Sequence, residues 1–268
     1  MIINVHRNSV NNIGDLLSSP LKYFKYDDKT KVIDICDDYK SVFFTKWLCN
    51  LKLEKMHIIF GGGGLLDNNF FENELNYITN LKPDSIIYWG VGHNKHYNEN
   101  IPRLNSSSKA LLRASKLWGV RDKIEGLNYL PCSSCMHPAL GMNLGLRNDI
   151  VIYEHEHIPL STSDLDNKPK MTNNNHDFEE VVKFLGSANY VITNSYHGMY
   201  WALLLKKKVV AVPFSNKFDL FSYDVPMGRI EEWSELLEKS TIYDNALEEC
   251  RLLNNEFYKK TLTLYQQI

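Results

Sequence analysis

The sequence predicts an α/β fold with mostly parallel sheets, made of two Rossmann-like halves that face a cleft. Short runs of Ile, Val, Phe and Tyr alternate along the chain with segments of helical periodicity. Several runs lack polar alternation, which is typical of strands covered on both faces. Between Gly141 and Asp149 the alternation stops, and a new strand then opens. This interruption indicates two tandem halves.

Eight strands and six helices follow from the pattern. Strands are expected where β-branched and aromatic residues gather, at Ile2–Val5, Lys31–Ile35, His57–Phe60, Ser85–Trp89, Leu117–Val120, Asp149–Tyr153, Tyr190–Thr193 and Val209–Val212. Helices are expected where apolar residues recur at helical spacing, at Gly14–Tyr23, Phe70–Leu81, Ser107–Ser115, Asp177–Gly186, His197–Lys206 and Asp244–Gln267.

The interruption predicts a division into residues 1–145 and 146–268. A second polar stretch, residues 161–175, is expected to be a mobile loop. Open α/β sheets bind ligands beyond the carboxyl ends of their strands, so two such halves would enclose a ligand cleft.

The composition is that of a globular protein, with 44% hydrophobic and 23% charged residues among 268. A net charge of −2 argues against a nucleic-acid partner. No apolar run approaches the roughly 20 residues that span a bilayer. The N-terminus, MIINVHRNSVNN, is expected to be a first strand and not a signal peptide. Five cysteines, an odd number, favour reduced thiols and a cytoplasmic location.

Residues suited to ligand binding follow two strands of the first half. Gly14 and Asp15 come after the first strand, and the aspartate would either cap a helix or contact substrate. Four glycines, residues 61–64, follow the third strand. Gly62 and Gly63 among them would let the backbone approach a ligand. The run matches neither a dinucleotide fingerprint nor a P-loop.

Two further strand ends carry a histidine and an arginine. Gly90 and Gly92 predict a glycine-rich turn that leads to His93, which would lie at the surface or in a site. Arg121 ends the next strand, and its guanidinium would either hold a carboxylate or phosphate or form a surface ion pair with Asp122.

Cysteines and histidines offer a weak case for a metal site. Cys132, Cys135 and His137 could begin a zinc site, but no second pair of ligands completes it. A redox pair would ordinarily open a helix, which this one does not. His155 and His157 would share one face of a strand and are expected at the surface or lining the cleft. We therefore expect no metal.

The second half carries its most informative stretch at the strand-to-helix junction after Thr193. Asn194, Ser195, Tyr196, His197 and Gly198 occupy the start of the predicted helix. Free amides and the helix dipole make such a start suitable for an anion. Lys217 ends the next strand and would lie beside it. A capped helix with a buried histidine would give the same pattern.

Together these motifs resemble the polysaccharide pyruvyl transferase family. They occur in the family's order over roughly residues 11–218, as NIGD (12–15), FGGGGLL (60–66), WGVGH (89–93), LWGVRD (117–122), TNSYHG (193–198) and VPFSNKF (212–218). CSSCMHP resembles members that make ketals on exopolysaccharide repeat units. Many members have Arg-Leu-His-Gly where this chain has Ser195-Tyr196-His197-Gly198. One positive contact to the donor would therefore be missing or supplied elsewhere, with Arg121 and Lys217 as the candidates.

The resemblance implies a GT-B-like architecture and transfer of pyruvate from phosphoenolpyruvate (PEP) to a sugar of a bacterial polysaccharide or its lipid-linked precursor. Residues 1–145 would be the acceptor side, and residues 146–268, with the C-terminal helix, the PEP side. PEP would be the donor substrate, with no cofactor. A lipid-linked acceptor would place the protein at the inner face of the cytoplasmic membrane, through a peripheral association.

The resemblance also implies roles for the residues. His197 would perform acid–base chemistry or bind phosphate, and Asp15 would orient or deprotonate an acceptor hydroxyl. Arg121 and Lys217 would hold the anionic donor, together with the helix start from Asn194 to Gly198. Gly62, Gly63, Gly92 and His93 would line the acceptor side.

Two other functions fit the same pattern. A GT-B-like glycosyltransferase that uses a nucleotide sugar would have the same predicted elements. A non-catalytic carbohydrate-binding or scaffold protein would also keep the fold, and Ser195 in the place of an arginine keeps that alternative open.

Overall fold

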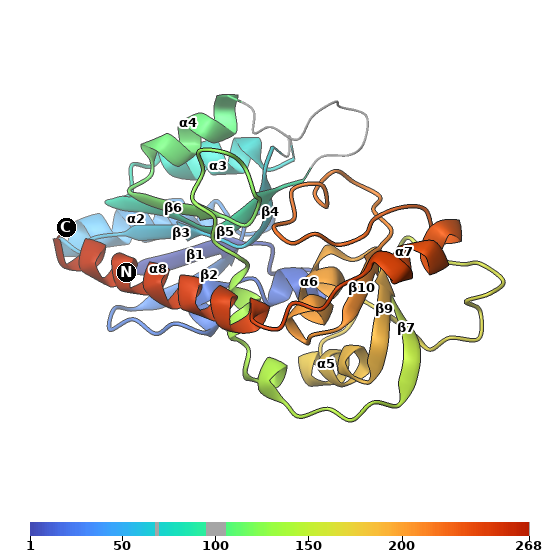
Figure 1. The fold of residues 1–268 in the computed structure, drawn as a ribbon. Coiled ribbons are helices and arrows are strands. Elements are labelled where there is room, and N and C mark those ends of the chain that lie inside the picture. The colour runs from blue at the N-terminus through green and yellow to red at the C-terminus, as the bar shows by residue number, and fades with distance from the viewer. Residues whose placement is uncertain (68–69, 95–105, 268) are drawn as a thin grey trace.

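The computed structural model describes residues 1–67, 70–94 and 106–267 and contains two parallel β-sheets. The strands of the first sheet belong to the first half of the chain and those of the second sheet to the second half (Figure 1). All eight predicted strands are confirmed. The division at residue 145 stays a prediction, although no strand crosses it.

The first sheet has the strand order β2-β1-β3-β5, and β5 also pairs with β4 and β6. Phe60 of β3 pairs with Tyr88 of β5, and Gly63 of β4 pairs with Val91 of β5. Strand β4 therefore continues β3 along the same side of β5. The strands are β1 (Ile2–His6), β2 (Thr30–Asp34), β3 (His57–Phe60), β4 (Gly63–Leu66), β5 (Ser85–His93) and β6 (Leu117–Val120).

Helices cover both faces of this sheet. One face packs against α2 (Ser41–Lys52), α3 (Glu72–Asn80) and α4 (Ser106–Ala114), through a core that includes Val42, Leu75 and Leu112. The other face carries Ile2, Ile59, Ile87 and Trp89, and it packs against η1 (Pro20–Lys22) and the C-terminal helix. Alternate residues of β1, β3 and β5 thus serve the two cores.

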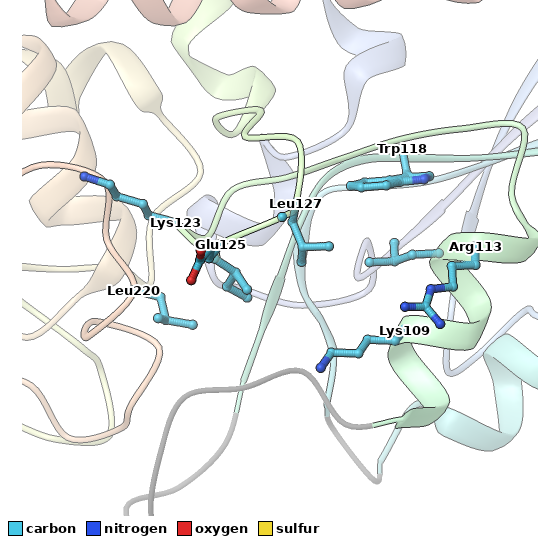
Figure 2. Close-up of a pocket in the computed structure, with 10 residues that line it drawn as sticks. Lys109, Arg113, Trp118, Lys123, Glu125, Leu127 and Leu220 are labelled. Carbon is cyan, nitrogen blue, oxygen red and sulfur yellow. The ribbon is translucent and has the colours of Figure 1, made fainter.

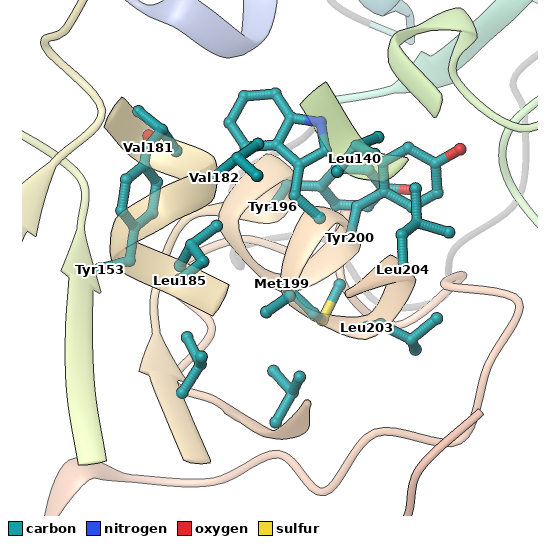
Figure 3. Close-up of a cluster of buried hydrophobic side chains, with 14 of the residues drawn as sticks. Leu140, Tyr153, Val181, Val182, Leu185, Tyr196, Met199, Tyr200, Leu203 and Leu204 are labelled. Carbon is teal, nitrogen blue, oxygen red and sulfur yellow. The ribbon is translucent and has the colours of Figure 1, made fainter. Parts of the chain in front are cut away.

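The second sheet has the order β10-β9-β7-β8 and is also covered on both faces. One face packs against α5 (Phe178–Gly186) and α6 (Tyr196–Leu204), where every residue of α6 is buried (Figure 3). The other packs against Leu160, Leu165 and α7 (Trp233–Lys239). The strands are β7 (Asn148–Glu154), β8 (Lys170–Thr172), β9 (Ala188–Thr193) and β10 (Lys208–Ala211).

The C-terminal helix α8 (Ala246–Gln267) connects the two halves. Its first turns bury Leu247 and Cys250 in the core around α6. Farther along, Phe257 packs against Trp89 of the first sheet, with ring centres 4.8 Å apart. Buried Asn254 accepts a hydrogen bond of 2.8 Å from the Trp89 indole. The helix therefore packs back onto the first half (Figure 1). No helix within the described ranges combines the length and apolar character needed to cross a bilayer.

Several elements differ from the sequence prediction. Helices α2 and α7 and strands β4 and β8 were not predicted, and β8 lies inside the expected loop 161–175. Gly90 and Gly92 lie inside the long strand β5 and not in a turn, so that prediction is wrong. The first helix is shorter than expected: α1 covers only Ile13–Leu16, and the 3-10 turn η1 follows from Pro20.

Candidate functional site

A cavity of about 440 Å³ lies beyond the carboxyl ends of strands from both sheets. The first half contributes Asn12, Asp15, Gly64, Asn94 and Arg121, and the second half contributes His155, Ile158, Asn173, Ser195, Tyr196, His197, Phe214 and Lys217. Asp15, Arg121, Ser195, Tyr196, His197 and Lys217 were predicted from the sequence, and the fold brings all six to this one cavity.

The start of α6 forms one wall of the cavity. Ser195 is the N-cap, and its hydroxyl accepts a 3.2 Å hydrogen bond from the amide of Gly198. The amides of Tyr196 and His197 open the helix, so they have no partner within it. The whole of α6 is buried, this first turn included. It presents N–H groups and the positive end of a helix dipole to the cavity.

His197 is a buried imidazole wedged between the two halves. Its ring lies 5.3 Å from the Trp201 ring, and its Nε2 lies 3.7 Å from the Cys132 thiol. A Cβ at Gly14 would overlap the imidazole, so only glycine fits there. Burial lowers the pKa of His197 well below its usual value, and the charges of Arg121 and Lys217 lower that pKa further. The histidine is therefore neutral near pH 7.

Arg121 brings a positive charge from the first half. Its side chain is buried, and its guanidinium carbon lies 4.1 Å from the centre of the Tyr196 ring. Nε and Nη1 are buried without a hydrogen-bond partner in the described part of the chain. The predicted surface ion pair with Asp122 is wrong, because both side chains are buried and Asp122 bonds to His93 instead. Unsatisfied buried donors on a cation indicate an anionic ligand.

Lys217 brings a second cation from the loop after β10. Its Nζ lies 4.6 Å from the centre of the Phe214 ring. The pKa of Lys217 is lowered to about 8, mainly by burial of the ammonium. The positive charge of Arg121 also lowers this pKa, and the negative charge of Asp15 raises it. The ammonium is thus charged at neutral pH but loses its proton in mildly alkaline solution.

Asp15 is the acidic residue of the cavity in the first half. Asn12 caps α1 by accepting from the amide of Gly14, so Asp15 is not the N-cap. Burial raises the pKa of Asp15, while Lys217 and Arg121 act in the opposite direction. A carboxylate of raised pKa is a stronger base than a surface aspartate.

His93 lies at the end of β5 and joins the two halves. Its Nδ1 lies 3.0 Å from an Asp122 carboxylate oxygen, and its Nε2 lies 3.1 Å from the carbonyl oxygen of Asn216. The backbone amide of His93 donates to the same Asp122 oxygen at 2.6 Å. His93 is buried and does not line the cavity. Through Asn216 it contacts the loop that carries Lys217.

Asn194 and Gly198 have structural contacts instead of lining the cavity. The Asn194 side chain accepts from the amide of His155 at 2.7 Å and donates to the carbonyl of Ile158 at 2.6 Å. It therefore fixes the loop after β7, of which His155 and Ile158 line the cavity. A Cβ at Gly198 would overlap the Tyr153 ring, so this glycine lets α6 approach β7.

The predicted glycines of the first half lie behind the cavity wall. The amide of Gly62 donates to the carbonyl of Ser18 at 2.9 Å, and Gly63 opens β4. A Cβ at Gly92 would overlap the Arg121 side chain, so Gly92 makes room for that arginine. Of the glycine run, Gly64 is the residue that lines the cavity.

Several cavity residues were missed from the sequence. Asn94, Asn173 and Ile158 carry no pattern that separates them from ordinary loop residues. Asn12, Gly64 and Phe214 lie inside the quoted motifs, but no contact with a ligand was predicted for them individually. His155 was expected only at the surface or in the cleft, and it lines the cavity beside Phe214, with ring centres 5.2 Å apart. His157 is exposed.

Cys132, Cys135 and His137 lie in and next to a short 3-10 turn, η2 (Ser133–Met136). Burial raises the thiol pKa of both cysteines. No group of three or more His, Cys, Asp or Glu among the described residues is arranged to hold a metal ion. The turn packs against α6 instead: the Trp201 indole donates to Ser134 and the Tyr200 hydroxyl donates to the Cys132 carbonyl, both at 3.0 Å.

A second cavity, of about 570 Å³, opens between α4, the segment after β6 and Leu220 (Figure 2). None of the predicted site residues lines it. Lys109, Arg113 and Lys123 stand around it with the Trp118 ring (Figure 2). Arg113 and Lys123 are exposed, and Lys109 and Trp118 are half-buried. The buried, unpartnered groups that indicate a ligand converge in the smaller cavity, where we place the site.

Comparison with solved structures identifies the fold as GT-B-like. UDP-GlcNAc 2-epimerase from Neisseria meningitidis, solved with UDP-GlcNAc, superposes with a TM-score of 0.51 at 10% identity, over 100% of this chain and 99% of that one. The Methanocaldococcus jannaschii UDP-GlcNAc 2-epimerase gives 0.50 at 9% identity, over 96% and 99%. These likenesses show the fold alone. No curated protein sequence matches the chain. A family model described as polysaccharide pyruvyl transferase matches residues 12–216.

Proposed function

Because the chain belongs to the polysaccharide pyruvyl transferase family, we propose that it transfers pyruvate from PEP to a sugar and forms a pyruvate ketal. The observation that carries the proposal is the convergence of Arg121 and Lys217, from opposite halves, with the first turn of α6 in one cavity. The acceptor in this proposal is a sugar of a polysaccharide or of its lipid-linked precursor, met at the inner face of the cytoplasmic membrane.

The charge in the cavity matches an anionic donor. PEP carries a phosphate and a carboxylate, and the cavity offers a guanidinium, an ammonium and helix-start amides. His197 is neutral there, so it adds a hydrogen-bonding group without charge. The guanidinium of Arg121 lies over the Tyr196 ring. In this proposal it supplies the positive charge that an arginine at position 195 would give in other members.

The reaction balances without an oxidant or reductant. A proton adds to C3 of PEP, which makes C2 electrophilic, and one sugar hydroxyl forms a bond to C2. The bond from C2 to the phosphate oxygen breaks, and a second sugar hydroxyl attacks C2 to close the ketal ring. Of the two hydroxyl protons, one replaces the proton used at C3 and the other leaves with phosphate. The scheme uses PEP as donor substrate and calls for no cofactor.

Two residues of the cavity supply the proton transfers in this proposal. Neutral His197 accepts a proton and passes it on, because its lowered pKa keeps a lone pair available near pH 7. Asp15, with its raised pKa, removes the proton of the acceptor hydroxyl. Arg121 and Lys217 stabilise the negative charge on the departing phosphate.

The test is the release of inorganic phosphate from PEP with a panel of lipid-linked sugar acceptors, together with transfer of isotopic pyruvate to the acceptor. We expect both with the wild-type protein and neither with the double variant His197→Gln, Arg121→Gln. Transfer of sugar from UDP-GlcNAc in place of pyruvate would support the nucleotide-sugar alternative. Binding of acceptor without any transfer would support the non-catalytic one.

A further inference from the structure

Helix α2 turns large apolar side chains to solvent. Phe44 and Trp47 are stacked on its surface, with ring centres 5.6 Å apart. The exposed fractions are 56% for Phe43, 59% for Phe44, 48% for Trp47, 64% for Leu51 and 94% for Leu53, which ends the helix. Five neighbouring apolar side chains this exposed form a patch, unlike a single exposed leucine.

Four of the five exposed apolar side chains lie opposite the face that holds α2 to its sheet, and the fifth, Leu53, caps the end of the helix. Val42, Thr45 and Cys49 are the buried residues of the helix. At 100° per residue, Phe43, Phe44, Trp47 and Leu51 fall within an arc of about 100° on the far side. The apolar face therefore points directly away from the protein. A helix that is apolar on both sides is ordinarily covered on both.

Lysines stand at both ends of this patch. Residues 37–55 contain four lysines and three acidic residues, Asp37, Asp38 and Glu54, and α2 itself contains no acidic residue. Lys46 pairs with Asp84. Lys40 stands at the start of the helix, while Lys52 and Lys55 stand at its end, and all three are exposed.

We propose that the α2 face, defined as Phe43, Phe44, Trp47, Leu51 and Leu53, docks on the surface of a bilayer that contains anionic lipids. Aromatic and aliphatic side chains enter the boundary between headgroups and acyl chains, and the flanking lysines attract anionic headgroups.

This interaction is separate from the chemistry of the cavity. Helix α2 lies on the face of the first sheet that carries α3 and α4, and none of its residues lines the cavity. The docking surface would therefore hold even if the donor proved not to be PEP. It would bring the protein to a membrane that carries a lipid-linked substrate.

The experiment is co-sedimentation of the full chain with vesicles of phosphatidylcholine alone or with phosphatidylglycerol added. We expect binding to the anionic vesicles, weakened by salt. The double variant Phe44→Ser, Trp47→Ser is expected to lose at least about tenfold of the partition coefficient. The control Ile242→Ser, Leu252→Ser removes two exposed apolar residues elsewhere and should bind as wild type. Circular dichroism and phosphate release with a water-soluble acceptor show that each variant is folded.

Two results would overturn the proposal. One is equal vesicle binding by the wild type and the Phe44→Ser, Trp47→Ser variant. The other is no vesicle binding by the wild type. In that case, sedimentation velocity separates a dimer that the variant dissociates, in which a second copy covers the face, from a monomer that leaves it open. A charge variant, Lys40→Glu with Lys52→Glu, should lose the preference for anionic vesicles while its helix stays intact.

Discussion

The guanidinium of Arg121 lies 4.1 Å from the centre of the Tyr196 ring. This contact joins the end of a strand in the first sheet to the first turn of α6 in the second half. It places a cation beside the start of α6, and both halves of the protein line the cavity. We propose that Arg121 supplies the charge that the motif lacks at Ser195.

Replacing Arg121 tests that contribution. We expect Arg121→Gln to raise the KM for PEP about 10- to 100-fold, because it removes charged hydrogen bonds worth about 1.5–3 kcal/mol. Tyr196→Phe is the matched control, since it keeps the ring beneath residue 121 and should change the KM little. An unchanged KM in Arg121→Gln would remove this residue from the donor site.

Gly14 tests the fit between the two halves. A Cβ here would overlap the His197 imidazole, so Gly14→Ala should displace that ring. We expect kcat/KM to fall on the order of 100-fold, as for a misplaced catalytic group, with the thermal midpoint lowered far less. Gly141→Ala, where a Cβ would meet nothing within 4 Å, is the control. Equal activities of the two variants would contradict a role for His197.

Lys217 predicts an alkaline limit to activity. Its pKa of about 8 means that the ammonium is charged below pH 8 and loses its proton as the pH rises through that value. We therefore expect kcat/KM for PEP to decline above about pH 8, because that parameter reports groups of the free enzyme. Lys217→Arg should keep its charge and move the decline to higher pH. A decline at the same pH in both proteins would assign it to another group.

Asn254 tests the attachment of α8. Its side chain accepts from the Trp89 indole and donates to the carbonyls of Pro131 and Cys250, all in a buried position. Asn254→Ala leaves these groups unpaired, at a cost of about 2 kcal/mol. A lower thermal midpoint, by roughly 4–8 °C, is expected, with Gln266→Ala on the same helix as control. An unchanged midpoint would show that α8 is held by its apolar contacts alone.

The strands could be predicted because they are continuous apolar runs, whereas α2 could not. Its outer residues, Phe43, Phe44 and Trp47, are apolar like its buried ones, which hides the 3.6-residue period. Strand β4 begins with Gly63 and Gly64, which have low strand propensity, and it forms because β3 continues along β5. Tertiary pairing thus decided β4, and the exposed apolar residues of α2 concealed its helical pattern.

The site was predictable where a side chain follows a strand end, as Arg121 does directly, His197 in the first turn of α6 and Lys217 in the loop after β10. Asn194 and His93 occupy the same kind of position, yet their hydrogen bonds go to the loop after β7 and to Asp122 and Asn216. Sequence position alone does not distinguish a side chain that faces a ligand from one that holds a loop. Residues such as Asn173 reach the cavity only through the packing of the two halves.

The central claim is that the cavity between the halves binds PEP, and calorimetric titration of PEP tests it most directly. We expect saturable one-to-one binding to the wild-type protein, at least about 100-fold weaker binding to the double variant Arg121→Gln, Lys217→Gln, and no displacement of PEP by UDP-GlcNAc. Equal PEP affinity in the wild type and the double variant, or competition between PEP and UDP-GlcNAc, would contradict the account.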